Sequence, residues 1–179
     1  MSRAVRTIRV EPLTPESYKP FGQVIGIPQE PPMTENEERS YWLSPALEMI
    51  DGSYAIVYVE MRMRDYVVRR LHRHTRFDQA LIPLGGKAFL HVVAPPGDVP
   101  DLDELRAFII DGSQAVIIRQ GTWHRNPAYP LSPEASLVLI SRRESIVLEA
   151  AERAGEHVGG PTEQIELATL TDDEIRLIL

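Results

Sequence analysis

The feature that most constrains the fold is a series of short apolar segments rich in β-branched and aromatic residues. They cover residues 54–59, 88–94, 115–118 and 137–140, and turns containing glycine, proline or aspartate separate them. Segments of this length and composition are typical of β-strands. Because no long helical stretch lies between them, an antiparallel sandwich or small barrel is favoured over a parallel α/β sheet. We therefore predict an all-β fold with a few short helices.

Helical signals lie mainly near the two ends of the chain. After a predicted strand at residues 6–10, Thr14 and Pro15 have the pattern of a capping residue followed by a first-turn proline. We predict one helical turn at residues 103–106. Residues 28–38 are rich in proline and glutamate, so we predict a loop there.

In the C-terminal part of the sequence, the spacing of apolar residues changes from that of strands to that of helices. Residues 146–154 read as helical, and the acidic residues 172–174 resemble the start of a last apolar helix that ends at Leu179. We predict a barrel over residues 1–145, with an N-terminal strand and helix. A helical tail over residues 146–179 is expected to pack on the barrel or on a partner.

Composition limits the classes of protein that remain. A chain of 179 residues with 43% hydrophobic content can bury one substantial core. It has no cysteine, so any metal site must use His, Gln, Asp or Glu. A net charge of -7 argues against nucleic-acid binding. The local basic cluster at residues 62–76 favours a small anionic ligand instead. The sequence shows neither a signal peptide nor a membrane span, so we expect a cytoplasmic protein.

Two histidine-bearing segments predict a functional site. His72 and His74 are two residues apart, so a β-strand would direct both imidazoles to one side. Gln79 follows with an amide oxygen, and His124 at the end of the 121–124 segment would add a third imidazole. An alternative interpretation is an exposed basic strand, because four arginines flank the first pair: Arg69, Arg70, Arg73 and Arg76.

Several motifs in the same order resemble the ureidoglycolate lyase family, whose fold is similar to the cupins. They are residues 13–14 with 21–25, 73–74 with 79–84, 100–108, 112–116, and 123–124 with Pro127. The resemblance covers residues 10–145 and implies a cupin-type double-stranded β-helix barrel, or jelly roll. It also implies cleavage of ureidoglycolate to glyoxylate and urea by a carbon–nitrogen lyase. The family typically has glutamate where this chain has His72, and histidine where it has Arg125.

The implied chemistry needs a base for the substrate hydroxyl and an acid for the departing nitrogen. His74 and His124 are the predicted catalytic pair, because imidazole titrates near neutral pH. A divalent metal held by His72, His74, Gln79 and His124 would assist, and a site rich in imidazole suits Zn, Ni, Mn or Fe. Arg73 and Gln79 are the predicted substrate contacts. The expected partners are a small anionic substrate and a second copy of the chain in a homodimer.

Two other functions fit the same residues. One is a cupin that binds a small molecule without converting it, as a sensor or regulator. The other is a metal-dependent cupin enzyme with a different reaction. Of the remaining histidines, His91 is expected in the core or barrel wall, and His157 in solvent.

Overall fold

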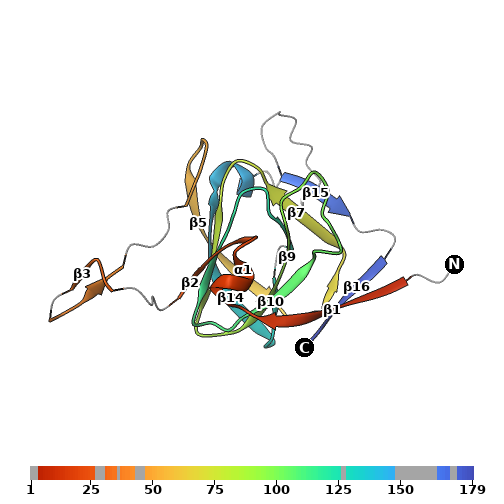
Figure 1. The fold of residues 1–179 in the computed structure, drawn as a ribbon, viewed down its shortest axis with the longest axis horizontal. Helices are drawn as coiled ribbons and strands as arrows, with labels where there is room; N and C mark the ends of the chain where they lie inside the picture. Colours follow the sequence, from red (N-terminus) through yellow and green to blue (C-terminus); the bar gives the residue numbers. More distant parts are fainter. Residues whose placement is uncertain are drawn as a thin grey trace.

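In the computed structural model, most of the regular secondary structure is β-strand, arranged mainly as two facing sheets (Figure 1). The structure describes residues 4–26, 31–35, 37–42, 47–125, 128–147, 165–169 and 173–179. The all-β prediction is confirmed. Within these ranges, no helix is both long enough and apolar enough to span a membrane.

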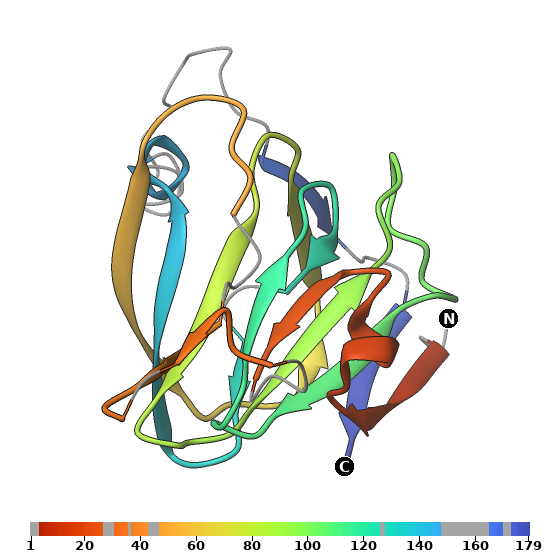
Figure 2. The ribbon, with the colours of Figure 1, turned by 60° about the vertical axis from the view of Figure 1, so that its left-hand side comes forward.

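Among the described residues, the larger sheet holds nine strands and the smaller one five. Figure 2 shows the two sheets after a rotation of 60° from the view of Figure 1. The order in the larger sheet is β15 (Ile165–Thr169), β7 (Arg70–His74), β12 (Trp123–His124), β9 (Phe89–Ala94), β10 (Arg106–Ile110), β1 (Ala4–Pro12), β16 (Asp173–Ile178) and β6 (Val67–Val68), with β13 (Tyr129–Pro130) also paired to β9. The order in the smaller sheet is β2 (Gly22–Ile25), β11 (Ala115–Ile118), β8 (Gln79–Leu84), β14 (Glu134–Arg142) and β5 (Tyr54–Arg62).

The connectivity is that of a jelly roll. Eight strands form its core, in chain order β5, β7, β8, β9, β10, β11, β12 and β14. The first, eighth, third and sixth of these lie side by side in one sheet, and the second, seventh, fourth and fifth in the other. Two interlocking Greek keys of this kind define the double-sheet architecture that cupins share. The predicted cupin-type barrel is therefore confirmed.

Strand β9 is buried on both faces. Phe89 and Val93 belong to the apolar cluster between the sheets, whereas Leu90 and Val92 belong to a second cluster on the other face of the larger sheet. Successive strand residues point to opposite faces. His91, which shares the parity of Phe89 and Val93, therefore faces the barrel interior.

The predicted N-terminal helix is present as one turn, α1 (Pro15–Tyr18), and Tyr18 is fully buried. The Thr14 side chain accepts a hydrogen bond from the Ser17 backbone amide at 3.1 Å, and the Ser17 hydroxyl accepts one from the Thr14 amide. This reciprocal arrangement is a capping box. The Thr14 signal thus explains where the helix begins.

Two local predictions were wrong. Residues 103–105 do not form a helical turn, because the Asp101 carboxylate accepts the Asp103 amide hydrogen in a local turn that competes with a helix. Part of the predicted 28–38 loop is a hairpin, in which β3 (Thr34–Glu35) pairs with β4 (Ser40–Tyr41).

The predicted C-terminal helix was also wrong where the structure describes it. Residues 173–178 form β16, which pairs in parallel with β1 and antiparallel with β6. Ile175 and Leu177 are buried while Arg176 is exposed, so the segment has a period of two. Strand pairing therefore determines the conformation of this segment, although its acidic residues resemble the start of a helix. Residues 143–147 are helical, and residues 148–154 of the other predicted helix lie outside the described residues.

Candidate functional site

The two histidine segments lie on adjacent strands of the larger sheet. β7 pairs antiparallel with β12, and the pairing places His72 directly opposite His124. The Gly121 amide donates a hydrogen bond to the His74 carbonyl at 2.6 Å, and Gly121 has a φ of 82°, which favours glycine. This turn brings the 121–124 segment against β7.

The three imidazoles form one buried cluster. His72, His74 and His124 are 6%, 2% and 2% exposed, and each offers a ring nitrogen within 4.8 Å of the others. The His72 and His124 Nε2 atoms are 2.8 Å apart. The alternative of an exposed basic strand is therefore wrong for these histidines.

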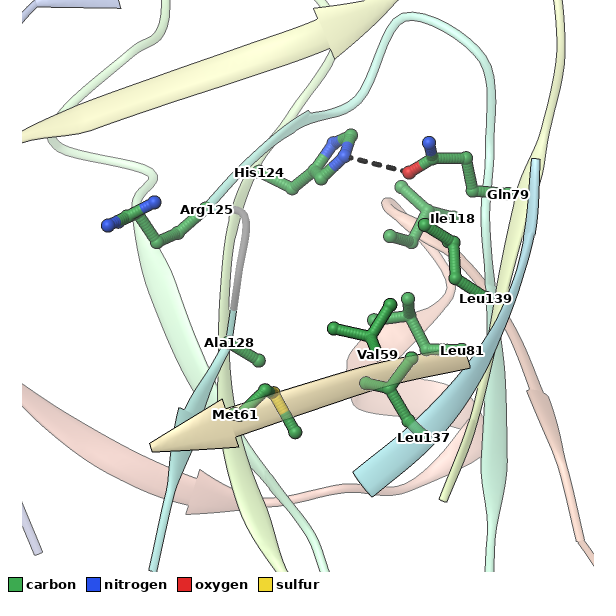
Figure 3. A pocket seen from close by; sticks show the side chains of 10 residues that line it. All are labelled: Val59, Met61, Gln79, Leu81, Ile118, His124, Arg125, Ala128, Leu137 and Leu139. Carbon is green, nitrogen blue, oxygen red and sulfur yellow. Dashed lines mark hydrogen bonds between the residues drawn. The ribbon is translucent and has the colours of Figure 1, made fainter. Parts of the chain in front are cut away.

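Gln79 joins the cluster from the smaller sheet. Its Oε1 lies 3.1 Å from His124 Nε2, and its Nε2 donates to Ser141 Oγ at 2.8 Å (Figure 3). Both Gln79 and Ser141 are buried. The structure thus brings together all four residues that the sequence predicts as metal ligands.

The His124 ring has a defined tautomer. Its Nδ1 lies 2.9 Å from the Thr122 carbonyl, which can only accept, so Nδ1 carries the hydrogen. Burial lowers the pKa of His124 to about 4, although the Thr122 carbonyl acts in the opposite direction. At neutral pH the ring is uncharged, and the Nε2 lone pair points toward His72 and Gln79.

His74 has no hydrogen-bond partner in the described part of the chain for either ring nitrogen. Burial, and then the neighbouring His124, hold its pKa well below the usual value of 6.5. A buried polar group without a partner is costly, and only a few occur in a typical native structure. The ring is neutral, and one of its nitrogens carries an uncommitted lone pair.

The cluster has the chemistry of a metal site. Neutral imidazoles are common ligands of Zn²⁺ and related ions, and a hydrogen bond from the second ring nitrogen to a carbonyl typically orients such a ligand. His124 has this bond to Thr122. Its Nε2 lone pair and the Gln79 oxygen face each other at 3.1 Å, an arrangement that a cation between them would stabilise. His72, His74 and His124 can therefore hold a metal, with Gln79 beside them.

The opposite wall of the pocket is apolar. Figure 3 shows the side chains that close the space below His124 and Gln79, namely Val59, Met61, Leu81, Ile118, Leu137 and Leu139. An apolar wall excludes water and strengthens electrostatic interactions at the polar end.

Arg73 does not lie with the imidazoles. Its guanidinium donates to the Gly97 carbonyl and lies 4.9 Å from the Trp123 ring centroid. Strand alternation places it on the face of β7 opposite His72 and His74. Arg125 contributes to the pocket wall, but its guanidinium points away from the apolar residues and donates to the Tyr129 hydroxyl at 3.3 Å (Figure 3).

Several residues near the cluster were not among the predicted site residues. The His91 ring centroid lies 6.3 Å from that of His124, and His91 Nε2 is 3.2 Å from the Tyr18 hydroxyl. Burial lowers the pKa of His91 to about 3 and raises that of Tyr18. The barrel-wall expectation for His91 agrees with this position. Thr122 lies in the predicted 121–124 segment, two residues before His124, whereas nothing in the sequence around Ser141 marks it.

The sequence is similar to a known protein family. The family model described as ureidoglycolate lyase matches residues 5–156. A ureidoglycolate lyase of Pseudomonas aeruginosa strain LESB58 is 35% identical over 150 residues, which cover 79% of this chain and 86% of that protein. One from Azotobacter vinelandii is 31% identical over 169 residues, covering 91% and 98% of the two chains.

A structural match was also found. The structure of RmlC from Streptococcus suis in complex with dTDP-D-xylose aligns with 50% of this chain and 43% of that chain, with a TM-score of 0.40 and 15% sequence identity. The family is established by the sequence matches, which cover most of the chain. The chain belongs to the ureidoglycolate lyase family.

Proposed function

We propose that the protein is a carbon–nitrogen lyase that cleaves ureidoglycolate into glyoxylate and urea. The names of its relatives support this activity. The structural observation that carries it is the buried cluster of His72, His74 and His124, because imidazole provides the proton transfers that the reaction needs.

The reaction breaks one C–N bond and moves one proton. A base removes the hydrogen of the substrate hydroxyl, the oxygen forms a C=O bond, and the C–N electron pair leaves with the urea nitrogen. That nitrogen then takes up a proton. His74 is suited to be the base because it is neutral and its ring nitrogens have no partner among the described residues. Because burial holds the pKa of His74 low, its protonated ring can readily return the proton to the urea nitrogen, directly or through the neighbouring His124.

A divalent metal is the proposed cofactor, and His72, His74, Gln79 and His124 would hold it. Zn, Ni, Mn and Fe suit such an imidazole-rich set. When bound, the ion would lower the pKa of the substrate hydroxyl. An imidazole has one lone pair available, so His74 cannot be a metal ligand and a base at the same time. Metal dependence therefore separates these two roles.

Substrate contacts by Gln79 and Arg73 remain predictions. Gln79 faces the cluster and can reach a ligand there. Arg73 would first have to leave the Gly97 carbonyl and the Trp123 ring. The geometry therefore favours Gln79 over Arg73 as a substrate contact.

The activity is tested by measuring glyoxylate release from ureidoglycolate with purified protein, before and after removal of bound metal. Glyoxylate release that chelation abolishes would support both the lyase and the metal. Release that survives chelation would support His74 and His124 as an acid–base pair without metal. Binding of ureidoglycolate without release would contradict the proposed lyase and favour a binding protein.

We also propose a cytoplasmic homodimer. The supporting feature is the edge strand β5, where Tyr54, Ile56 and Tyr58 are 45%, 78% and 63% exposed on one face. An apolar edge strand favours pairing with another chain. Light scattering would give the mass of the wild type and of Ile56→Glu. A monomeric wild-type protein would contradict the dimer.

A further inference from the structure

Ser141 holds the end of the Gln79 side chain that faces away from the imidazoles. Ser141 lies on β14 immediately after Ile140, which pairs with Ala80 on β8, so its hydroxyl lies beside Gln79. The hydroxyl is fully buried and accepts the Gln79 amide hydrogen at 2.8 Å. In the described part of the chain, Gln79 is the partner found for this hydroxyl.

The orientation of the Gln79 amide places two acceptors against each other. His124 Nδ1 carries the hydrogen because it faces the Thr122 carbonyl, so His124 Nε2 can only accept in the neutral ring. The Gln79 oxygen, which also only accepts, lies 3.1 Å away. These two lone pairs repel unless a cation satisfies both, even though His72 Nε2, which lies 2.8 Å from His124 Nε2, can also donate to the His124 ring.

The reverse orientation removes this repulsion. If the amide turns by 180°, its N–H group donates to His124 Nε2, and the Ser141 hydroxyl donates to the amide oxygen. A hydroxyl can both donate and accept, so Ser141 satisfies either orientation. A carboxylate at position 79 could not provide the N–H group.

We propose that Ser141 is a positioning residue on which the Gln79 amide turns, with its oxygen toward the imidazoles when a divalent cation is bound and its nitrogen toward them when the site is metal-free. This inference rests on the proposed metal site and gives Gln79 a role that glutamate cannot have. Ser141 would therefore contribute to the metal affinity through Gln79, because the Ser141 hydroxyl faces the Gln79 amide and not the imidazoles.

Zn²⁺ binding to the full chain, measured by calorimetry, tests the positioning role. Ser141→Ala should weaken Zn²⁺ binding about tenfold, the usual effect of losing a group that orients a ligand. Ser141→Thr keeps the hydroxyl and should bind Zn²⁺ like the wild type. In a Gln79→Ala background, Ser141→Ala should have no further effect, because the amide that it orients is absent.

The amide orientation is measured separately by NMR, with the Gln79 side-chain resonances assigned by their loss in Gln79→Glu. Metal-free protein should show contacts between the amide hydrogens and the His124 ring, and Zn²⁺ should replace them with contacts to the Ser141 β-hydrogens. An unchanged orientation would overturn the proposal. So would Ser141→Ala with wild-type affinity, or an equal loss of affinity in the Gln79→Ala background.

These outcomes are distinct from failure of the proposed function. If the wild type releases glyoxylate but does not bind Zn²⁺, the metal site and the Ser141 proposal are both wrong while the lyase stands. If it binds Zn²⁺ with the expected Ser141 dependence but releases no glyoxylate, the lyase is wrong and the positioning role stands.

Discussion

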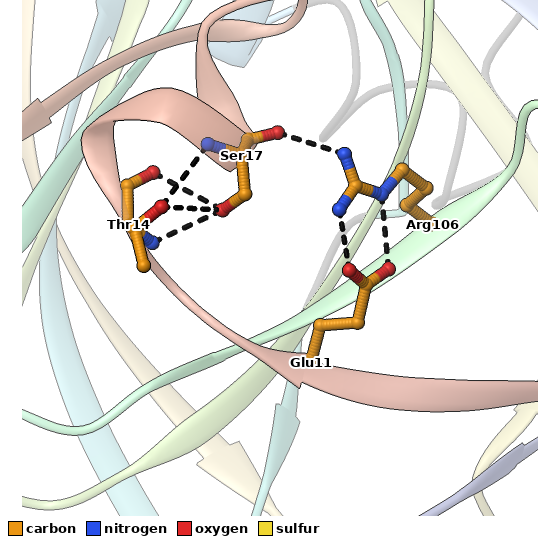
Figure 4. A network of polar contacts seen from close by, with 4 residues as sticks. All are labelled: Glu11, Thr14, Ser17 and Arg106. Carbon is orange, nitrogen blue, oxygen red and sulfur yellow. Dashed lines mark hydrogen bonds and ion pairs between the residues drawn. The ribbon is translucent and has the colours of Figure 1, made fainter.

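Two polar clusters of this protein differ in how completely their hydrogen bonds are satisfied. Near the surface, Arg106 pairs with the Glu11 carboxylate through two nitrogens and donates to the Ser17 carbonyl at 2.9 Å, beside the Thr14 capping box (Figure 4). In the barrel interior, both ring nitrogens of His74 have no partner among the described residues. The first cluster is built for stability. The second leaves lone pairs for a ligand, at a cost in stability.

The largest expected effect comes from replacing His74 with an apolar residue of similar size. His74→Leu should reduce glyoxylate release about 10³-fold, because the ring is lost as base or ligand. The free energy of unfolding should stay the same or increase, since two unpartnered buried nitrogens are removed. Activity assays and denaturant unfolding would measure both. A clear loss of stability would show that His74 is a structural residue and would break the contrast between the clusters.

Acid should destabilise the interior cluster selectively in the metal-free protein. The pKa values of His124 and His91 are about 4 and about 3 in the folded state, below the ordinary 6.5. The unfolded chain therefore binds more protons as the pH falls below about 6.5. Stability should be fully present above pH 6.5 and decrease down to about pH 3, and each unit by which a pKa is lowered should contribute about 1.4 kcal/mol.

Urea unfolding at several pH values would measure this loss. His91→Phe, which removes one of the shifted groups, should flatten the profile and provides the matched control. Equal stability of the wild type at pH 7 and pH 4.5 would mean that these imidazoles are not desolvated.

In the surface cluster, substitutions should reduce stability and leave activity unchanged, which is the reverse of the effect expected for His74→Leu. Arg106→Ala removes the charged hydrogen bonds to Glu11 and the bond to Ser17, and we expect a loss of about 2 kcal/mol in unfolding free energy. Arg106→Lys should recover only part of it, because lysine lacks the paired donor geometry. Glyoxylate release per folded molecule should not change. A fall in that rate would connect the surface cluster to the site.

The smallest effect is expected at the helix cap. Thr14→Ala loses the side-chain acceptor for the Ser17 amide and should cost about 1 kcal/mol. Thermal unfolding would measure it, with Thr14→Ser as the control that keeps the hydroxyl. If both variants unfold alike, the capping bond adds nothing to stability.

Local sequence patterns predict much of this barrel and one side of its site. The segment at residues 115–118 forms a strand with these bounds, and the spacing of His72 and His74 directs both rings inward. The Thr14–Pro15 pattern also finds its helix. Each of these signals depends on neighbours within a few residues.

Contacts between distant segments could not be predicted in this way. β16 forms because Ile175 and Leu177 add to an apolar layer beside β1, at the far end of the sequence. Ser141 faces Gln79 because of the pairing of β14 with β8, and His91 meets Tyr18 across the barrel. No local pattern marks these partners, because the contacts exist only once the sheets close.

The strand β15 bears directly on how this protein can be divided into fragments. It pairs with β7 so that Ile165 lies opposite His74 and Leu167 opposite His72, although the family match stops at residue 156. β16 likewise pairs with β1. A recombinant version trimmed to the matched region would remove the backbone neighbour of the histidine strand. A synthetic peptide of residues 165–179 could then be added to the trimmed protein. Recovery of metal affinity would show that the peptide has paired with the histidine strand.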